Sequence, residues 1–553
     1  MNKVKKFGIF IAALLLFTLF FGLGSHGLID PDEGRYAEIP REMLETGDFI
    51  TPRLNYVKYF EKPILHYWLT AASFAALGHN EFAARLTPAL CSLGGAFLVF
   101  ILARKRWGLD AGVYAVVVLS TGLLWFGVAS INIIDMTVSF FITLSLTGYW
   151  LACGEGEGEG ASGQSDRKYL LLFYAGMALA TLSKGLIGIV LPGGIVFWHI
   201  ALTRRWRLIG RMLYWPGIAL FFFLSVPWFW AVCHANEDFF HFFFIQEHFL
   251  RYATRMHGRY QPMWFFVPIL IAGLIPWAGL LPDIFLEAAR QIGYKSTRSF
   301  GVFLGLWFAV PFIFFSLSSS KLIPYIVPCM PPLAILGGRI LCCIAGGDGE
   351  RGKRLLIMSF VIWLILTIGG FVYIAVMSDR AMAVNISRHI AKPLTAIFCF
   401  VCVGFFTYRA RSYSNMVRGM CVLAFAGTAF FAKGFELAAE TKSYRETAAV
   451  VRAHAGPGDV VVCHRDVAQG LSFYLGKRIV LANELGELEF GARHEKDPRW
   501  FIGSEALQSL WKEPTRVLLV TEARHVKRLV SLLGEGNIIE AGRTQSGVVL
   551  SNY

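Results

Sequence analysis

The chain has 553 residues, of which 55% are hydrophobic and only 16% are charged, and its mean hydropathy is +0.53. A soluble globular protein carries roughly a quarter of charged residues, so this composition excludes an ordinary soluble protein and indicates a membrane protein. The net charge of +14 would suit nucleic-acid binding, but the basic residues stand in short clusters between apolar runs, which is typical of membrane topology signals. No basic face with interleaved aromatic residues is evident outside those runs, so we exclude nucleic acid as a partner.

The first apolar segment, residues 7–23, follows three lysines and has no small-residue cleavage site at its end. We therefore interpret it as a retained membrane anchor whose N-terminus lies in the cytoplasm. Residues 24–80, which follow it, are then an external juxtamembrane region.

Within that region, residues 64–77 form a short apolar segment that is interrupted by His66. About 20 residues are needed to cross the hydrocarbon core, and this segment is shorter. If it crossed, the basic run at residues 104–106 would lie outside, against the positive-inside tendency. We therefore predict a helix on the outer face, amphipathic or re-entrant, rather than a span.

The remaining apolar segments up to residue 435 alternate across the membrane and predict about thirteen spans in total. Each predicted cytoplasmic connection carries at least two basic residues. Residues 154–160 are a flexible Gly/Glu linker on the inner side, and residues 234–261 are a long external loop. An odd number of spans places the C-terminal tail outside, opposite the N-terminus.

The composition changes in the tail, residues 436–553. Short apolar runs at residues 460–463, 478–481, 516–520 and 547–550 predict buried strands, and residues 444–455 and 522–533 have helical spacing. Alternation of strands and helices predicts a small external α/β domain with its own core.

Charged residues gather directly after the first apolar segment, in a motif that contains Asp32, Glu33, Arg35 and Tyr36. A lone acid, Asp135, stands at the outer end of a later span. Charges beside a membrane must be paired or used, because desolvation makes them costly. We therefore predict a site for charged chemistry, with these five residues as its catalytic candidates. Glu38 and Glu42, in the same predicted helix, fit a wet helix surface better.

Several bases stand at outer membrane ends, where the positive-inside rule disfavours them. An anionic phosphate would explain them, because Arg binds phosphate in a bidentate manner and Lys binds it as a point charge. Snorkelling to the interface is the alternative. These bases are Lys62, Lys184, Arg251 and Lys321.

A metal site is a further possibility on the outer face. Glu61 and His248 are its best candidate ligands, because carboxylate oxygens and imidazole nitrogens bind divalent metals. The spacing of the acids and histidines there is not diagnostic, so structural histidines remain the alternative.

The motifs resemble a known family. Residues 32–44, the pair Gly47-Asp48, and Tyr59-Phe60-Glu61-Lys62-Pro63 resemble the lipid A aminoarabinose transferases, within the protein-mannosyltransferase-like C-type glycosyltransferases. The similarity continues through Asp135, Ser183-Lys184-Gly185, Glu247-His248 with Arg251, and Lys321-Leu-Ile-Pro-Tyr325. It covers residues 1–345 well, whereas the tail keeps only a weak likeness at residues 443–451.

The resemblance implies a mainly α-helical C-type glycosyltransferase fold in the bacterial inner membrane, with a transmembrane domain over residues 1–435 and a periplasmic α/β domain over residues 436–553. It implies transfer of 4-amino-4-deoxy-L-arabinose from undecaprenyl phosphate to a lipid A phosphate on the periplasmic side. Lys62, Arg251 and Lys321 would then bind the leaving phosphate. Asp32 and Asp135 would orient the substrates and favour an oxocarbenium-like state. Glu61, Lys184 and Tyr325 would complete the substrate-binding set.

Other functions stay open from the sequence. The acceptor could instead be a protein hydroxyl, as for protein O-mannosyltransferases, and Asp32 would then serve as general base. A transporter or flippase for a lipid-linked sugar would place charges at mid-membrane and show repeated halves. A membrane sensor would leave Asp32, Lys62 and Asp135 without a use.

Overall fold

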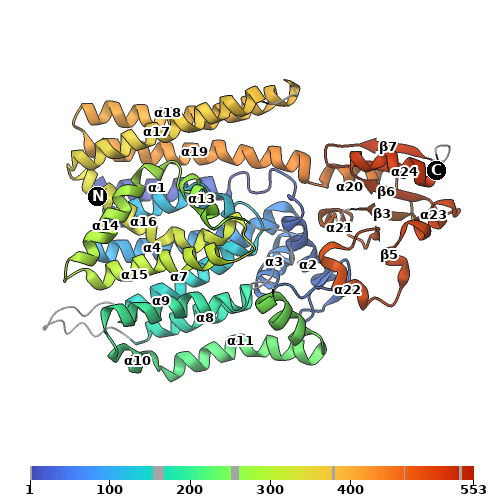
Figure 1. The fold of residues 1–553 in the computed structure, drawn as a ribbon, viewed down its shortest axis with the longest axis horizontal. Helices are drawn as coiled ribbons and strands as arrows, with labels where there is room; N and C mark the ends of the chain where they lie inside the picture. Colours follow the sequence, from blue (N-terminus) through green and yellow to red (C-terminus); the bar gives the residue numbers. More distant parts are fainter. Residues whose placement is uncertain (1–2, 154–166, 251–260, 377–379, 466–467, 535–537) are drawn as a thin grey trace.

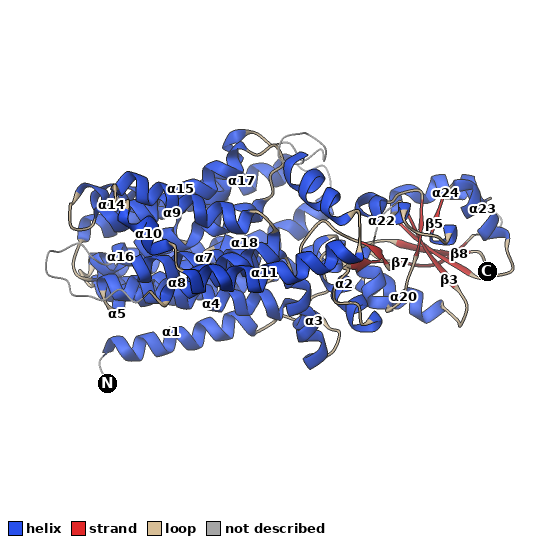
Figure 2. Cartoon of the chain, turned by 90° about the horizontal axis from the view of Figure 1, so that it is seen from below, coloured by secondary structure: helices blue, strands red, loops and turns tan. Residues whose placement is uncertain are grey.

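A computed structural model describes residues 3–153, 167–250, 261–376, 380–465, 468–534 and 538–553. Figure 1 shows a body of long helices at one end and a sheet-containing unit at the other, with α2 and α3 between them. In Figure 2 the strands gather in the part of the molecule that holds the C-terminus. The mainly helical fold with a small C-terminal α/β domain is therefore confirmed.

Seven helical segments among the described residues are long and apolar enough to cross a membrane. They are α4 (Glu81–Trp107), α7 (Ile134–Cys153), α11 (Trp215–Ala235), α15 (Arg298–Leu317), η4 with α16 (Ile323–Cys329 and Met330–Ala345), α17 (Gly349–Val376) and α19 (Tyr413–Lys442). Two bent pairs would raise the number to nine if each were one span. The expected count of about thirteen spans stays a prediction.

The first bent pair is α5 (Leu109–Thr121) with α6 (Leu123–Ala129), which meet at 67°. The second pair, bent by 111°, joins η2 and α13 (Met263–Phe265 and Phe266–Gly273) to η3 and α14 (Trp277–Leu280 and Leu281–Gly293). The other helices of the body are α1 (Lys3–Phe20), α8 (Tyr169–Lys184), α9 (Ile187–Thr203), α10 (Arg207–Met212), η1 (His241–Leu250) and α18 (Arg380–Arg409).

Helix α7 lies inside the bundle, where 89% of its apolar stretch is buried. It packs against α4, α8 and η4. The acid at its first turn, Asp135, therefore faces protein rather than lipid, which is where an ionisable residue is tolerated in a membrane protein.

The juxtamembrane region contains α2 (Asp32–Thr46), a hairpin of β1 (Arg53–Leu54) and β2 (Val57–Lys58), and α3 (Leu65–Leu77). Helix α2 ends at Gly47, whose left-handed conformation (φ 70°) lets its N–H donate to the carbonyl of Met43. Helix α3 has 13 residues and packs against α2 and α4. The predicted short helix is present and lies beside α2 in Figure 1. That it does not cross the membrane stays a prediction.

The C-terminal unit is a six-stranded sheet in the order β5-β4-β3-β6-β8-β7. Strands β5, β4, β3 and β6 are parallel, and β8 and β7 continue antiparallel. The strands are β3 (Val460–His464), β4 (Val480–Ala482), β5 (Phe501–Ile502), β6 (Val517–Thr521), β7 (Ile539–Arg543) and β8 (Val548–Ser551). The helices are α20 (Arg445–His454), α21 (Gln469–Leu475), η5 (Gly486–Leu488), α22 (Glu489–Arg493), η6 (Pro498–Trp500), α23 (Ser504–Lys512), η7 (Ala523–His525) and α24 (Val526–Leu533).

This unit is fastened to the juxtamembrane region by side chains that bond backbone groups. The Asn55 amide accepts from the N–H of Ile479 (3.0 Å) and donates to the carbonyl of the same residue (2.9 Å). The N–H of Gly470 donates to Asp30 Oδ1 (2.9 Å), and a Cβ on Gly470 would lie only 2.5 Å from the other Asp30 oxygen. The sheet unit therefore sits at a fixed place against α2.

Candidate active site beside the C-terminal unit

Glu33 is buried at the start of α2, with 1% of its surface exposed. It accepts from Nε and Nη2 of Arg85 (2.7 and 2.8 Å) and from the N–H groups of Asn132 (2.7 Å) and Ile29 (2.9 Å). Burial raises the pKa of Glu33, but Arg85 and these hydrogen bonds outweigh it and lower that pKa overall. Both carboxylate oxygens thus accept hydrogen bonds from the protein, which favours a structural role for Glu33 over the predicted catalytic one.

Arg85 of α4 is a residue that the sequence analysis missed. It is fully buried, and besides Glu33 its guanidinium donates to the carbonyls of Leu23, His26 and Gly27 at 2.9–3.0 Å. It therefore joins the chain that follows α1 to α2 and α4. An arginine inside the apolar run at residues 82–103 was the available signal.

Arg35 lies between two acids and two aromatic rings. Its guanidinium pairs with Asp32 and with Glu487, which belongs to the C-terminal unit. It stands 5.2 Å from the ring centroid of Tyr36 and 5.9 Å from that of Tyr59. The Arg35 side chain is 6% exposed and the Asp32 side chain 52%, so Asp32 presents its carboxylate to solvent whereas Arg35 does not.

Glu487 follows β4 and was also missed, because it lies about 450 residues from α2 in a tail for which only a weak family likeness, at residues 443–451, was expected. One of its oxygens accepts from the Tyr59 hydroxyl (3.1 Å) as well as from Arg35. The C-terminal unit therefore contributes a charged group to this site.

Buried tyrosines line the site. Tyr36 contacts the ring of Tyr67 (centroids 6.0 Å apart) and the edge of His66 (5.5 Å). Burial raises the pKa of the Tyr36 hydroxyl, Arg35 opposes this, and the charges of Asp32, Asp135 and Glu61 raise it further. These three acids belong to three separate segments of the chain.

His66 connects α3 to the start of α7. Its ring nitrogens lie 2.9 Å from the Thr137 hydroxyl and 3.0 Å from the Asn132 side-chain oxygen. Burial lowers the pKa of His66 to about 4, so the imidazole is neutral at physiological pH. This neutral bridge fixes the turn that carries Asp135.

Asp135 forms an ion pair with Lys184 at the end of α8. The Asp135 side chain is 13% exposed and the Lys184 side chain 9%, and Lys184 Nζ stands 4.5 Å from the ring centroid of Tyr325 in η4. The structure therefore brings together three of the predicted site residues, from three elements.

Lys62 and Glu61 lie on the loop between β2 and α3. Lys62 Nζ is 3.8 Å from the Glu61 carboxylate and donates to the Glu61 carbonyl (2.9 Å). The charge of Glu61 also raises the pKa values of Tyr59 and Tyr67, after burial as the main cause. The pair is therefore adjacent to the tyrosine wall.

Lys321 has a different environment from the one predicted. It is 5% exposed, and its Nζ donates to the carbonyls of Gln261 (2.8 Å) and Ser318 (2.6 Å). These contacts hold the turn between α15 and η4. The geometry thus favours a structural role for Lys321 over phosphate binding.

Two predicted residues cannot be placed. Arg251 lies outside the described residues, and the side chain of His248 in η1 is likewise not described. Within the described part of the chain, no three His, Cys, Asp or Glu side chains gather as metal ligands would. The metal site of Glu61 and His248 stays a prediction.

Glu38 and Glu42 are fully buried, which corrects their expected place on a wet helix surface. Arg41 donates to both oxygens of Glu38 (2.6 and 2.7 Å), and Glu42 accepts from the N–H of Tyr56 (2.9 Å). Burial raises the pKa of both acids. They serve the packing of α2 against the loop before β2.

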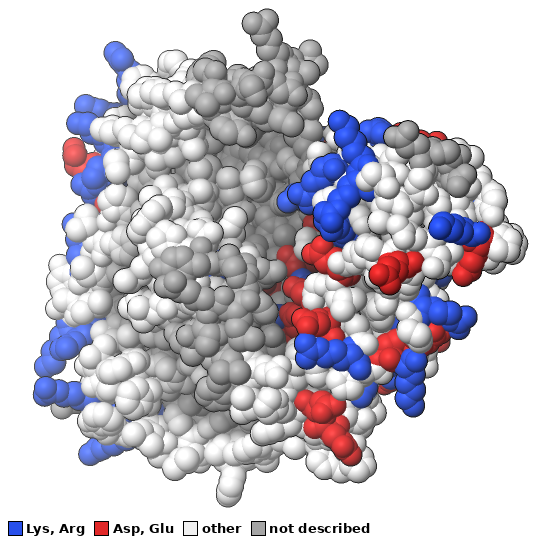
Figure 3. All heavy atoms as spheres, turned by 45° about the vertical axis from the view of Figure 1, so that its right-hand side comes forward, with Lys and Arg blue, Asp and Glu red and all other residues white. Residues whose placement is uncertain are grey.

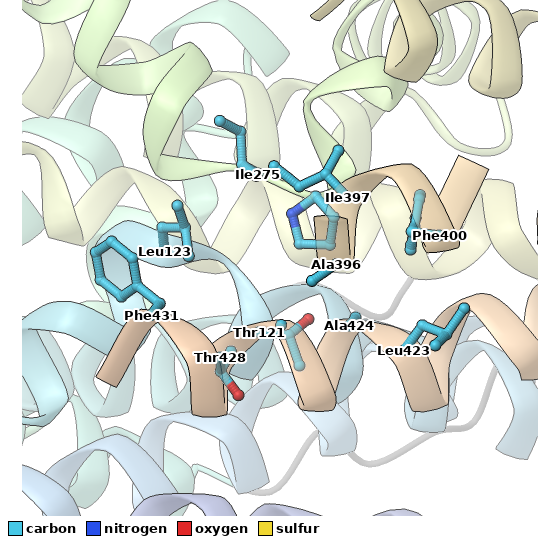
Figure 4. A pocket seen from close by; sticks show the side chains of 12 residues that line it. Thr121, Leu123, Ile275, Ala396, Ile397, Phe400, Leu423, Ala424, Thr428 and Phe431 are labelled. Carbon is cyan, nitrogen blue, oxygen red and sulfur yellow. The ribbon is translucent and has the colours of Figure 1, made fainter. Parts of the chain in front are cut away.

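A separate small pocket lies among the bends of the bundle. Figure 4 shows that Leu123 after the α5–α6 bend, Ile275 and side chains of α18 and α19 surround it. Its lining is apolar apart from Thr121 and Thr428, and the described lining residues include no acid or base. It does not compete with the charged site as a place for polar chemistry.

The chain is similar to known families of glycosyltransferases. Residues 7–243 match the family described as dolichyl-phosphate-mannose-protein mannosyltransferase, and residues 447–539 match the aminoarabinose transferase C-terminal domain. The match of residues 447–539 corrects the expectation of only a weak family likeness in the tail. The crystal structure of ArnT from Cupriavidus metallidurans bound to undecaprenyl phosphate superposes with a TM-score of 0.86 at 28% identity, over 99% of this chain and 98% of that one. The chain is thus similar to the aminoarabinose transferases in its membrane part and in its C-terminal unit.

Curated members of the aminoarabinose transferase family are similar over the membrane part. An undecaprenyl phosphate-α-4-amino-4-deoxy-L-arabinose arabinosyl transferase from Pseudomonas fluorescens is 35% identical over 371 residues, which are 66% of this chain and 64% of that protein. One from Pseudomonas aeruginosa is 36% identical over 59% of this chain and 58% of its own length. These alignments thus span less than two thirds of the curated relatives.

A more distant likeness shows the fold alone. The oligosaccharyltransferase of Archaeoglobus fulgidus superposes with a TM-score of 0.53 at 11% identity, over 97% of this chain and 71% of that one. The C-type glycosyltransferase fold that the aminoarabinose transferase family implies, in a polytopic membrane protein, is therefore confirmed.

Proposed function

We propose that this protein is an integral inner-membrane glycosyltransferase that moves 4-amino-4-deoxy-L-arabinose from undecaprenyl phosphate to a lipid A phosphate. The observation that carries the proposal is a set of three ion pairs: Asp32 with Arg35 beside Tyr36, Glu61 with Lys62, and Asp135 with Lys184. The names of the curated relatives supply the sugar and the donor.

The reaction breaks the bond between the sugar C1 and the donor phosphate oxygen, and undecaprenyl phosphate leaves. Negative charge grows on that phosphate as the bond breaks, so cations placed there stabilise the transition state more than the ground state. Lys62 and Arg251 are the proposed phosphate ligands, and Lys184 is a third cation within the site. An oxygen of the acceptor phosphate forms the new bond to C1.

The acids are proposed to act on the sugar, where positive charge develops. As the leaving group departs, positive charge develops on the sugar ring, and carboxylates nearby stabilise it. Asp32 is the accessible carboxylate, and Asp135 is held by Lys184. An amino sugar carries a cationic ammonium at neutral pH, so both acids also suit its recognition.

A phosphate acceptor is already an anion and needs no strong general base. A hydroxyl acceptor on a protein would need one, and the half-exposed Asp32 carboxylate would be its base. The experiment therefore has to distinguish a lipid A phosphate acceptor from a protein hydroxyl acceptor. A flippase is disfavoured by the location of the described site residues, which cluster at one end of the bundle rather than at its middle.

The test uses purified protein, the undecaprenyl-phosphate-linked amino sugar, and lipid A in detergent. We expect mass spectrometry to show lipid A heavier by one aminoarabinose, and no product with Lys62→Ala. If peptide or glycan acceptors are modified while lipid A is not, the acceptor assignment is wrong. If donor is neither consumed nor transferred with any acceptor, the enzyme proposal fails.

The proposed topology places the N-terminus in the cytoplasm and residues 436–553 in the periplasm. A reporter fused after Tyr553 should be active only outside the cytoplasm. A requirement for a divalent metal at Glu61 and His248 is tested in the transfer assay with a chelator and by metal analysis of the purified chain.

A further inference from the structure

Two large apolar side chains stand next to each other on the loop that follows α2, residues 48–51, here called the tip loop. Phe49 is 40% exposed and Ile50 is 42% exposed. Adjacent exposed side chains of this size, on a loop that also carries the charge of Asp48, are typical of a contact surface rather than of a loop in water. The structure of the loop indicates what that surface contacts.

Two tryptophans bond the carbonyls of the exposed residues. The indole N–H of Trp68 in α3 donates to the Phe49 carbonyl (2.9 Å), and the indole N–H of Trp228 in α11 donates to the Ile50 carbonyl (3.0 Å). Tryptophans of membrane proteins are enriched at the interface of the bilayer, where the ring meets apolar groups and the N–H meets a polar one. Both carbonyls are therefore bonded by the protein and do not depend on water.

Asp48 bonds amide groups of the same loop. Its Oδ1 accepts from the N–H groups of Ile50 (3.1 Å) and Thr51 (3.0 Å), and its other oxygen pairs with Arg53 (3.3 Å). The Thr51 hydroxyl accepts from the side-chain amide of Asn236, directly after α11 (2.9 Å). A segment in contact with lipid must satisfy its backbone groups within the protein, because hydrocarbon offers no hydrogen bonds. The tip loop meets this condition at four of its backbone groups.

The tip loop packs against the end of a helix whose surface faces lipid. Only 17% of the apolar stretch of α11 is buried, which is the lowest share among the seven apolar helices of the described chain. Its outward side chains include Phe223 (75% exposed) and Trp230 (68% exposed). Trp228, which holds Ile50, lies two residues before Trp230. The exposed side chains of the loop therefore adjoin a lipid-facing helix.

The distribution of charge agrees with this location. On the face drawn in Figure 3, Lys and Arg lie along one edge of the helical body, further charges lie on the C-terminal unit, and the described surface between them is almost free of charge. Helix α2, which the tip loop follows, lies between the body and the C-terminal unit in Figure 1. The loop thus lies where a bilayer around the uncharged band would end.

We propose that Phe49 and Ile50 form a membrane anchor that inserts into the acyl chains of the leaflet next to α2. Side chains inserted at the boundary of headgroups and acyl chains contribute binding through the apolar area that they bury. Because α2 ends at Gly47, directly before the loop, the anchor sets the height above the bilayer of the helix that carries Asp32 and Arg35. The inference needs a polytopic membrane protein, but it does not depend on the proposed sugar transfer.

The test uses the full chain in vesicles of phosphatidylethanolamine and phosphatidylglycerol. Photoreactive p-benzoylphenylalanine replaces Phe49 or, in a second variant, Ile50, and mass spectrometry of the illuminated protein measures the yield of phospholipid adduct. The same replacement at Trp230 is the reference for lipid contact, and at Tyr553, 55% exposed in the C-terminal unit, it is the matched control. We expect both loop positions to react as Trp230 does, with at least about tenfold more adduct than Tyr553.

Fragmentation of the adduct shows which part of the lipid has reacted. Adducts on the acyl chains at both loop positions support the anchor. Adducts on headgroups alone, yields as low as that of Tyr553, cross-links to a second copy of the chain, or cross-links only within the chain overturn it. If the replacement of Phe49 lowers the unfolding temperature, the Ile50 variant decides the outcome.

Discussion

At the scale of single residues, the ion pair of Asp135 and Lys184 explains how two charges are tolerated inside a helical bundle. Each partner is almost buried, so neither charge is tolerated without the other. Removing one partner leaves an unpaired buried charge, whereas removing both leaves none. The pair can therefore be tested separately for its structural and its chemical contribution.

We expect Asp135→Asn and Lys184→Met each to lower the unfolding temperature, because an unpaired buried charge costs about 3–5 kcal/mol. The double variant should recover most of that stability and still lose at least about a hundredfold of transfer activity. Thermal unfolding in detergent and the lipid A transfer assay measure the two effects. Full activity in the double variant would show that the pair is structural only.

The raised pKa of Glu42 predicts in which direction the stability of the protein changes with pH. Its pKa is raised by burial and by Glu38, so the folded protein binds this proton more tightly than the unfolded chain does. The resulting stability is complete below about pH 4.5 and is lost as the pH rises through the raised value. Glu42→Gln has no proton to lose, so its advantage in unfolding temperature should grow as the pH rises above about 4.5.

The matched control for Glu42→Gln is Glu45→Gln, three residues later in α2. The Tyr56 hydroxyl, opposed by burial and assisted by Arg41, lowers the pKa of Glu45, so its contribution is lost as the pH falls, the opposite sense. Unfolding temperature against pH is the measurement. Parallel curves for the wild type and Glu42→Gln would contradict the assignment.

At the scale of elements, α2 is the helix that joins the helical bundle to the C-terminal unit. Its first turns bond α4 through Glu33 and Arg85, and the C-terminal unit through Arg35 and Glu487. The chain just before it meets α21, where Asp30 fits between Gly34 and Gly470 with no space for another carbon atom. The site is therefore held by contacts between elements rather than by any one element.

Gly470→Ala should loosen the C-terminal unit, because the new Cβ would lie 2.5 Å from Asp30 Oδ2. Overpacking of this kind costs about 1–3 kcal/mol. Gly503→Ala, where nothing lies within 4 Å, is the matched control in the same unit. We expect faster proteolytic release of residues 436–553 for Gly470→Ala only, and equal release rates would contradict the packing argument.

How much of the fold and of the candidate site could be predicted from the sequence differs from element to element. The strands β3, β4, β6 and β8 follow from apolar runs, because each is buried on both sides. Strand β5 has two residues and β7 is mostly exposed, so neither has an apolar pattern to find. Charges were predictable as a group from the cost of placing them beside a membrane, but their partners were not. Arg85 and Glu487 are distant in sequence from α2, and burial of Glu38 and Glu42 depends on neighbours that no local pattern reveals.

At the scale of the whole molecule, the C-terminal unit is part of the candidate active site. Glu487 fixes Arg35 and accepts from Tyr59, so its loss should disturb the wall of the site without removing the acids. We expect Glu487→Ala to reduce kcat/KM about tenfold or more, mainly through KM, with membrane insertion unchanged. Glu489→Ala, which pairs only within α22, is the control. Unchanged kinetics would limit the unit to a role outside the site.

The hydrogen bond from Gly470 to Asp30 joins residues that are 440 positions apart in the chain. The ribosome therefore finishes the helical body long before the segment that completes the outer site emerges. A nascent or truncated chain can occupy the membrane, but it lacks the Glu487 carboxylate that pairs with Arg35. Competence for transfer should then appear late in biosynthesis, after residues 436–553 have folded onto α2.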